Sequence, residues 1–273
     1  MAQDSTTALH HSSGLCPTCG GVHAAEACPT ARGARPAPPA DMALIEDLVA
    51  ANRILAAEKV VDGFGHVSVR HDKDRSRFLL ARSMAPAMVT TEDILEFDFD
   101  GNALVANGPA VYLERFIHAE IYRRRPDVNA IVHSHSPAVI PFSVTSIPLR
   151  AIYHVSSFLG AGLPVFDIRD IAGDTDMLVR NSGLGAALAT SLADKPAALM
   201  RGHGSVAVGK TLQLAVFYAI YLEMNARIQA EAIRLGPITY LTEKEAALSA
   251  AVTDNQATRA WDLWKLQITK SLG

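Results

Sequence analysis

Two histidines separated by a single residue, His133 and His135, are the clearest chemical signal in the sequence. They follow the apolar run Ala130–Val132, and Pro137 ends the segment. Side chains two residues apart leave the same face of a β-strand, so an extended segment here projects both imidazoles together. Neutral imidazole is among the commonest metal ligands in proteins. The pair therefore predicts half of a divalent-metal centre, which other parts of the chain must complete.

His203 is the candidate third ligand. It lies between Gly202 and Gly204, with apolar segments on both sides, so the backbone can turn sharply and the imidazole need not pack in the core. If it meets the first pair, three imidazoles would bind a divalent metal and leave positions open, as a catalytic metal requires. The alternative is an ordinary hydrogen-bonded core histidine, because His-x-His is a short and common pattern.

Glu114 is a candidate acid or base. It lies in a helix expected over residues 111–125, and His118 follows four residues later on the same helical face. A carboxylate beside a metal either ligates it or moves a proton. The alternative is a solvated glutamate, since Glu120 and several arginines share the same segment.

All three cysteines of the chain lie within its first 30 residues. Residues 1–40 are rich in Ser, Thr, Ala, Pro and Gly without a hydrophobic period, which predicts a flexible tail and linker before a body of residues 41–273. Within the tail, four residues have the spacing of a tetrahedral zinc site: Cys16, Cys19, His23 and Cys28. They predict a second, structural zinc, and the alternative is a disordered tail with incidental cysteines.

The composition describes a globular protein with a sizeable core: of 273 residues, 49% are hydrophobic and 19% charged. The net charge of -3 gives no electrostatic reason to expect nucleic acid or an anionic membrane as a partner, so a small molecule is expected. No apolar run approaches the ~20 residues of a membrane helix. The N-terminus also lacks the charged-then-apolar order of a signal peptide, and we expect a cytoplasmic protein.

The hydrophobic patterns mix strands and helices in a way typical of one α/β or α+β domain. Strands are expected at 66–70, 77–81, 95–99, 103–105, 130–135, 163–166, 197–200 and 205–208, with the third and fourth forming a hairpin. Helices are expected at 41–58, 111–125, 178–193, 212–235, 243–252 and 258–271.

Several motifs in a fixed order carry a resemblance to a known family. They are Gly65-x-Val67-Ser68-Val69-Arg70, then Glu114-Arg-Phe-x-His118, then Pro126-Asp127 before Ile131-Val-His133-Ser-His135, and finally Leu199-x3-His203-Gly204. Over about residues 42–240 the chain resembles the class II aldolase/adducin family, whose members include sugar-phosphate aldolases, an epimerase, decarboxylases and adducin head domains.

The resemblance implies a three-layer α/β/α fold with a central, mostly antiparallel sheet. It also implies a homotetramer with active sites between subunits. His133, His135 and His203 would bind zinc, manganese or iron, and Glu114 would be the catalytic acid or base. Adducin-type members lack these histidines, so the complete set favours an enzyme over a binding protein.

Two departures from the sugar-phosphate members narrow the expected substrate. The turn reads Gly65-His66-Val67-Ser68 in place of Gly-Asn-x-Ser, and the following loop, Arg82-Ser83-Met84-Ala85-Pro86, lacks a glycine for close backbone approach to phosphate. Arg82 with Ser83 would instead bind a carboxylate. The alternative for Arg82 is a surface side chain at a strand end.

These motifs, together with Tyr153-His154, resemble the decarboxylase branch, which acts on aromatic or ring-cleaved dicarboxylic acids. We therefore expect a metal-dependent carbon–carbon lyase that decarboxylates a hydroxylated aromatic or enol dicarboxylic acid of the dihydroxyphthalate type. His66, Ser68, Arg82 and Ser83 would hold the substrate, and Glu114 or His154 would supply the proton, with Tyr153 as a further candidate. The alternatives are a class II aldolase, a non-haem iron oxygenase on the same scaffold, and an adducin-like binding protein.

Overall fold

A computed structural model describes residues 38–105 and 108–270 of the chain. The chain divides into two units, residues 1–38 and 39–273, and the elements below all belong to the second unit. The cysteines and the histidine of the expected tail zinc site lie outside the described residues. No described helix is both long enough and apolar enough to span a bilayer.

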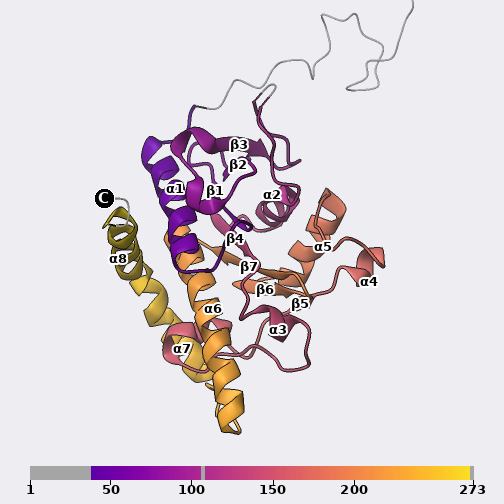
Figure 1. Cartoon of the computed structure of the whole chain (residues 1–273), viewed down its shortest axis with the longest axis vertical. Coiled ribbons are helices and arrows are strands. Elements are labelled where there is room, and N and C mark those ends of the chain that lie inside the picture. Colours follow the sequence, from indigo (N-terminus) through magenta and orange to yellow (C-terminus); the bar gives the residue numbers. More distant parts are fainter. Residues whose placement is uncertain (1–37, 106–107, 271–273) are drawn as a thin grey trace, which may run out of the picture. The chain divides into compact units, whose positions relative to one another are not determined.

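The centre of the fold is a seven-stranded sheet (Figure 1). Its spatial order is β3 (Ile94–Asp98), β2 (Arg77–Ala81), β1 (His66–Arg70), β4 (Ala130–Ser134), β7 (Gly204–Gly209), β6 (Ala197–Met200) and β5 (Val165–Phe166). Neighbouring strands are antiparallel except for β5 and β6, which are parallel. The expected mostly antiparallel sheet is confirmed.

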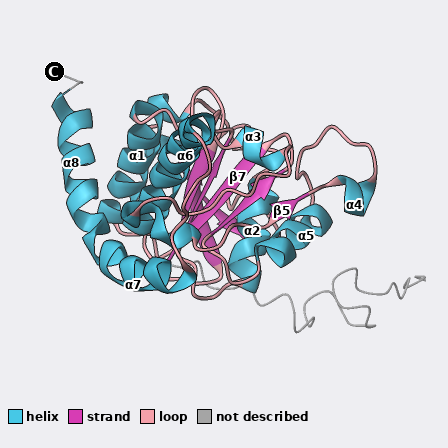
Figure 2. Cartoon of the chain, turned by 90° about the horizontal axis from the view of Figure 1, so that it is seen from below, coloured by secondary structure: helices cyan, strands magenta, loops and turns pink. Residues whose placement is uncertain are grey.

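Helices cover both faces of this sheet and complete three layers (Figure 2). One layer contains α1 (Met42–Ala57), α6 (Leu212–Leu235), α7 (Glu243–Thr253) and α8 (Ala257–Lys270), and the other contains α2 (Arg115–Arg124) and α5 (Ser182–Leu192). The shorter helices are α3 (Ile140–Ser143), α4 (Arg169–Ala172) and four 3-10 turns, at Pro86–Met88, Thr91–Asp93, His154–Leu159 and Asp254–Gln256. The α/β/α expectation is therefore also confirmed.

Strand alternation divides the core between the two helical layers. Val67 and Val69 of β1 and Val132 of β4 pack in the cluster that contains α1 and α6, whereas Ile131 packs in the cluster that contains α2 and α5. Successive side chains of a strand point to opposite faces, so His133 lies on the same side as Ile131, toward α2.

The α2-facing side of β1 is polar although it is buried. His66, Ser68 and Arg70 alternate with the valines, and they are 4%, 0% and 5% exposed. Arg70 donates to the carbonyl oxygens of Tyr122 and Arg125 at the C-terminal end of α2, at 3.0 and 3.1 Å. Its guanidinium thereby satisfies carbonyls that have no partner within the helix.

Several elements differ from the expectation. Helix α5 begins at Ser182 rather than at 178, and β5 contains only Val165–Phe166 of the expected 163–166. Helix α2 begins at Arg115 rather than near Val111, and Glu114 is its N-cap residue. The preceding segment is held outside the helix because the hydroxyl of Tyr112 donates to the Met84 carbonyl and the Ser83 amide donates to the Ala110 carbonyl. The expected return strand of the hairpin is reduced to one bridge, between Phe97 and Ala103.

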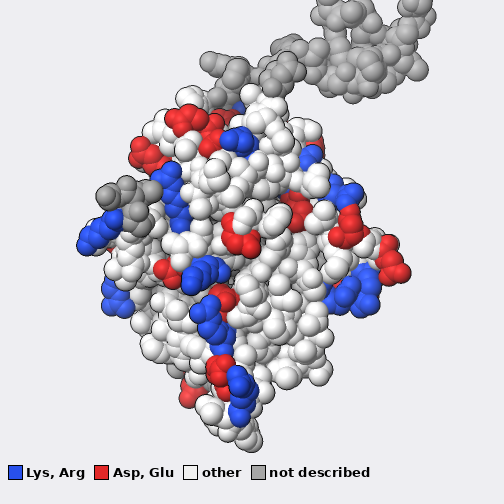
Figure 3. Space-filling model, in the orientation of Figure 1, with Lys and Arg blue, Asp and Glu red and all other residues white. Residues whose placement is uncertain are grey.

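Charged side chains of both signs are interspersed over the face drawn in Figure 3. On α6, for example, Glu231 pairs with Arg234 three residues later. Such pairs on a helix surface each contribute only a few tenths of a kcal/mol, roughly 0.2–0.5.

Candidate metal centre

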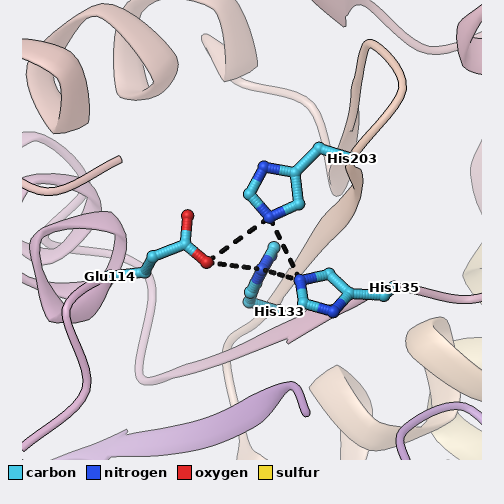
Figure 4. Close-up of side chains that lie close together, drawn as sticks. All are labelled: Glu114, His133, His135 and His203. Atoms are coloured by element: carbon cyan, nitrogen blue, oxygen red, sulfur yellow. Dashed lines mark hydrogen bonds and ion pairs between the residues drawn. The ribbon is translucent and has the colours of Figure 1, made fainter. Parts of the chain in front are cut away.

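Three imidazoles and one carboxylate converge on a single point between α2 and the sheet (Figure 4). One ligand atom from each of Glu114, His133, His135 and His203 lies within 4.8 Å of the others. The Nε2 atom of His135 is 3.2 Å from that of His133 and 3.1 Å from that of His203. The structure therefore brings together the three histidines that the sequence predicts, although they are up to 70 residues apart in the chain.

Each of these side chains has a distinct origin in the fold. His133 is in β4, His135 follows the end of that strand, and His203 is in the turn that joins β6 to β7. The turn depends on Gly202, whose φ of +62° is a conformation that side chains disfavour. Antiparallel pairing of β4 with β7 then sets the turn beside the two other histidines.

Backbone carbonyls orient two of the rings. Nδ1 of His133 donates to the Ser205 carbonyl at 3.1 Å, and Nδ1 of His203 donates to the Met177 carbonyl at 3.0 Å. With hydrogen on Nδ1, each ring turns the bare lone pair of Nε2 toward the centre. Such second partners are the usual way in which proteins fix metal-ligating histidines.

Glu114 faces the same centre from the N-terminus of α2. Its Oε1 accepts a hydrogen bond from the Val179 amide at 2.9 Å, while Oε2 lies 3.5 Å from Nε2 of His133 and 3.4 Å from Nε2 of His203. The hydrogen bond from the Val179 amide stabilises the ionised form of the Glu114 carboxylate.

The chemistry of this donor set fits a divalent cation. Nε2 of His133, Nε2 of His203 and the ionised carboxylate are all acceptors, so without a cation their lone pairs face each other. Two nitrogens at zinc-ligand distance in a tetrahedral site lie roughly 3.3 Å apart, close to the separations found here. Burial and the neighbouring histidines lower the pKa of His135 to about 4, which keeps it in the neutral form that binds metal.

A chain of buried hydrogen bonds lies beside this centre. Nδ1 of His66 is 2.6 Å from Nε2 of His118, and Nδ1 of His118 is 2.6 Å from Oγ of Ser68. Oγ of Ser68 is 2.8 Å from the hydroxyl of Tyr122. Burial and the nearby His133 lower the pKa of His118 to about 3. The hydroxyl of Ser68 thus lies inside the protein, whereas it was expected to hold the substrate.

Arg82 and Ser83 lie on the loop that Tyr112 holds. Nε of Arg82 donates to Oδ1 of Asp93 at 2.6 Å, and the Arg82 side chain is 39% exposed. Its two Nη atoms have no partner among the described residues, so they remain available to a carboxylate. Tyr112 connects this loop to the metal centre, because its ring centroid is 4.6 Å from that of His66.

Tyr153 and His154 are not part of this cluster. They lie at the 3-10 turn His154–Leu159, which packs on α6 and α7. His154 is exposed, and within the described part of the chain neither side chain makes a hydrogen bond, ion pair or ring contact with the four converging residues. Within one chain, they do not reach the centre.

Three residues at the site escaped the sequence reasoning. Met177 and Val179 contribute only backbone atoms, so no residue type in the sequence marks them. Phe64 is 69% exposed and its ring centroid is 6.2 Å from that of His135. In the sequence, the available signal was an aromatic residue between two glycines, in the turn before His66.

A cavity of about 420 Å³ opens beside His135. The charged residues of its wall are Lys59 and Asp62. The apolar residues of the wall are Ala56, Val60, Val61, Ala87 and Pro137. A larger cavity of about 750 Å³ lies at the other ends of β4 and β7, beside Val128 and Gly209, and contains none of the three histidines. The smaller cavity is the one that adjoins the metal centre, and its volume suits a small ligand.

Comparison with known proteins places this site in a family. Residues 46–230 match the model of the Class II Aldolase and Adducin N-terminal domain. Decarboxylase tropJ of Talaromyces stipitatus is 35% identical over 248 residues, which cover 82% of this chain and 93% of that protein. The 3,4-dihydroxyphthalate decarboxylase of Arthrobacter keyseri is 30% identical over 206 residues, covering 70% and 79%.

The solved structures give the same assignment. The L-fuculose 1-phosphate aldolase of Glaciozyma antarctica superposes with a TM-score of 0.70 at 27% identity, covering 85% of this chain and 95% of that one. Decarboxylases and aldolases are both lyases, and the resemblance expected from the ordered motifs is confirmed. The chain therefore belongs to the class II aldolase and adducin family and is a lyase within it.

Proposed function

We propose that the protein is a metal-dependent decarboxylase of a hydroxylated aromatic or enol dicarboxylic acid, similar to dihydroxyphthalate. The observation that carries the proposal is the convergence of three imidazole Nε2 atoms with the ionised Glu114. The two decarboxylases named above are similar over most of the chain, which supports the reaction type.

His133, His135 and His203 would hold the metal, and imidazole ligands suit zinc, manganese and iron alike. The bound metal supplies a Lewis acid that takes up the negative charge left when carbon dioxide departs. We also propose the homotetramer with intersubunit sites. In that assembly Tyr153 and His154 would serve the centre of a second copy, since they do not reach their own.

Glu114 would move the proton that the reaction needs. Its ionised Oε2 takes the proton of the substrate hydroxyl as that oxygen becomes an anion. The bond from carbon to the carboxylate then breaks, carbon dioxide leaves, and its electron pair stays on the substrate carbon. Glu114 returns the proton to that carbon. The hydrogen bond from Val179 to Oε1 keeps the carboxylate in place throughout.

The remaining substrate groups would be held near the loop of Arg82 and Ser83. The unpaired Nη atoms of Arg82 suit the second carboxylate, and the cavity beside His135 suits the apolar part of a ring. The second candidate is an aldolase, favoured by the structural match to L-fuculose 1-phosphate aldolase, because cleavage of an aldol leaves the same kind of carbanion.

The test combines metal content with turnover. In a Cys16→Ser, Cys19→Ser background, which removes two potential tail ligands, the protein should retain one divalent metal per chain. Adding His133→Ala should abolish both bound metal and turnover, and Glu114→Gln should keep the metal while slowing proton transfer. Retained metal with full activity after His133→Ala would exclude the site.

A parallel assay separates the two reactions. Carbon dioxide release from 3,4-dihydroxyphthalate supports the decarboxylase, while aldehyde release from a ketose 1-phosphate supports the aldolase. Activity on neither compound, with metal bound, would contradict the proposed substrate class.

A further inference from the structure

The hydrogen-bond chain from His66 to Tyr122 has a definite direction, which bears on the proposed function. Its four members are His66, His118, Ser68 and Tyr122, joined by contacts of 2.6, 2.6 and 2.8 Å. His118 and Ser68 are fully buried and Tyr122 is 1% exposed. Both imidazoles are in the neutral form, because such burial strongly disfavours a charge. Each ring therefore carries one hydrogen, on either Nδ1 or Nε2.

Only one arrangement of hydrogens satisfies every donor that is fully buried. The Tyr122 hydroxyl has no partner but Ser68 among the described residues, so it donates to Oγ of Ser68. The Ser68 hydroxyl must then donate to Nδ1 of His118, which places the His118 hydrogen on Nε2. That nitrogen donates to Nδ1 of His66, so the hydrogen of His66 is on Nε2.

The reverse arrangement leaves a buried donor without an acceptor. If Nδ1 of His66 donated to His118, His118 would donate to Ser68 and Ser68 to Tyr122. The Tyr122 hydrogen would then have no acceptor among the described residues, and the nearby side chains of Phe78 and Phe99, whose ring centroids are 5.4 and 6.2 Å from that of Tyr122, offer none. Leaving a buried donor without an acceptor is unfavourable enough to select one tautomer.

His66 presents its free nitrogen beside the metal centre. It is the direct cross-strand partner of His133, and the two ring centroids are 5.0 Å apart. Nε2 of His66 has no hydrogen-bond partner in the described parts of the chain, and it is not fully buried. It is therefore open to a ligand at the centre.

We propose that Ser68, His118 and Tyr122 hold His66 as the tautomer with hydrogen on Nε2, and that this N–H donates to the anionic oxygen of the substrate. Ser68, His118 and Tyr122 are positioning residues, since they act through His66. The donor role rests on the proposed decarboxylase function, whereas the tautomer does not.

Nitrogen NMR of the zinc-loaded full chain tests the tautomer without any substrate. With ¹⁵N-labelled histidine, the His66 signals are those missing from the spectrum of His66→Gln. We expect Nε2 to carry the hydrogen and Nδ1 to be a bare acceptor. Hydrogen on Nδ1 would overturn the proposal, whether or not the protein decarboxylates anything.

A second measurement tests whether the hydrogen-bond chain controls the tautomer of His66. Tyr122→Phe leaves Ser68 with one acceptor, Nδ1 of His118, so the His66 tautomer should be retained. Ser68→Ala removes the donor to His118, so the His66 signals should show both tautomers. A single unchanged tautomer in folded Ser68→Ala would show that the chain does not control His66.

The donor role is tested with two matched substitutions of His66. A glutamine amide reaches the position of Nε2, whereas an asparagine amide reaches only that of Nδ1. We expect His66→Asn to lower kcat/KM on 3,4-dihydroxyphthalate about 10- to 100-fold, with a clearly smaller loss for His66→Gln. Equal losses in the two variants, at equal zinc content, would refute the donation to substrate.

Discussion

Gly204 is the position at which a single methyl group should damage the metal centre most directly. A Cβ atom built there would lie 2.0 Å from the Ser134 carbonyl oxygen and 3.1 Å from Cα of His135. Carbon and carbonyl oxygen normally approach to roughly 3.3 Å, so the two chain segments must separate by more than about 1 Å. The atoms that clash are backbone atoms, which cannot swing away as a long side chain can.

This separation acts between two proposed ligands. Gly204 follows His203, and Ser134 precedes His135. The Nε2 atoms of these two histidines are 3.1 Å apart. Opening that gap by about 1 Å exceeds the roughly 0.2 Å tolerance of metal–ligand distances. We expect Gly204→Ala to weaken zinc binding at least 100-fold, which removes about 2.7 kcal/mol of metal-dependent stabilisation.

Gly209 provides the matched control at the other end of β7. Its added Cβ would lie 2.5 Å from the Ala215 amide nitrogen, so Gly209→Ala should also lower stability, by about 1–3 kcal/mol. Zinc affinity is measured by competition with a chromophoric chelator, in the background without tail cysteines. If Gly204→Ala binds zinc as tightly as Gly209→Ala, the metal centre does not depend on close β4–β7 packing.

Three further predictions concern stability. Ala193 ends α5 with φ 50° and ψ -124°, so Ala193→Gly should raise the free energy of unfolding by about 1 kcal/mol in a urea titration, and a decrease would contradict the strain. Arg70→Lys should lower the free energy of unfolding by about 2 kcal/mol or more, because a lysine cannot reach both the Tyr122 and the Arg125 carbonyl. An unchanged midpoint of the urea titration would refute the capping role. Hydrogen bonds from Arg169 and the ion pair with Arg201 hold the pKa of Asp167 below its ordinary value. The stabilisation from Asp167 is therefore present above about pH 4 and lost as the pH falls. The difference in Tm between wild type and Asp167→Asn should shrink from pH 7 to pH 3.

Local patterns were sufficient for the regular elements. Glycine-bounded alternation predicted β1, and helical periodicity predicted α6, whose bounds are those expected. The start of α2 was predicted too early because the bond between Tyr112 and Met84 joins segments 28 residues apart. Sequence spacing carries no information about such a contact.

The metal centre was predictable only in part, for a similar reason. The i, i+2 spacing brought His133 and His135 together, and the glycines beside His203 made it a candidate, but only the family resemblance favoured it over an ordinary core histidine. The carbonyls of Met177 and Ser205 orient the rings of His203 and His133. These are backbone groups, which would be present with almost any residue at those positions. The burial of Ser68 could not be seen either, because alternation in β1 shows which residues share a face but not what covers it.

The helical repeat of four residues and the strand repeat of two residues have nearly equal lengths, which explains how α2 places Glu114 beside the sheet. Four residues of helix rise about 6 Å, and two residues of strand rise about 6.8 Å. Glu114, His118 and Tyr122 therefore form a row on α2 that runs beside the row of His66, Ser68 and Arg70 on β1. Buried strand faces are normally apolar, so a polar face such as this one is tolerated only when each of its polar groups has a hydrogen-bond partner. The register that satisfies them is also the one that puts the Glu114 carboxylate opposite three imidazoles, so a shift of α2 by one turn would lose the internal hydrogen bonds and the metal centre together.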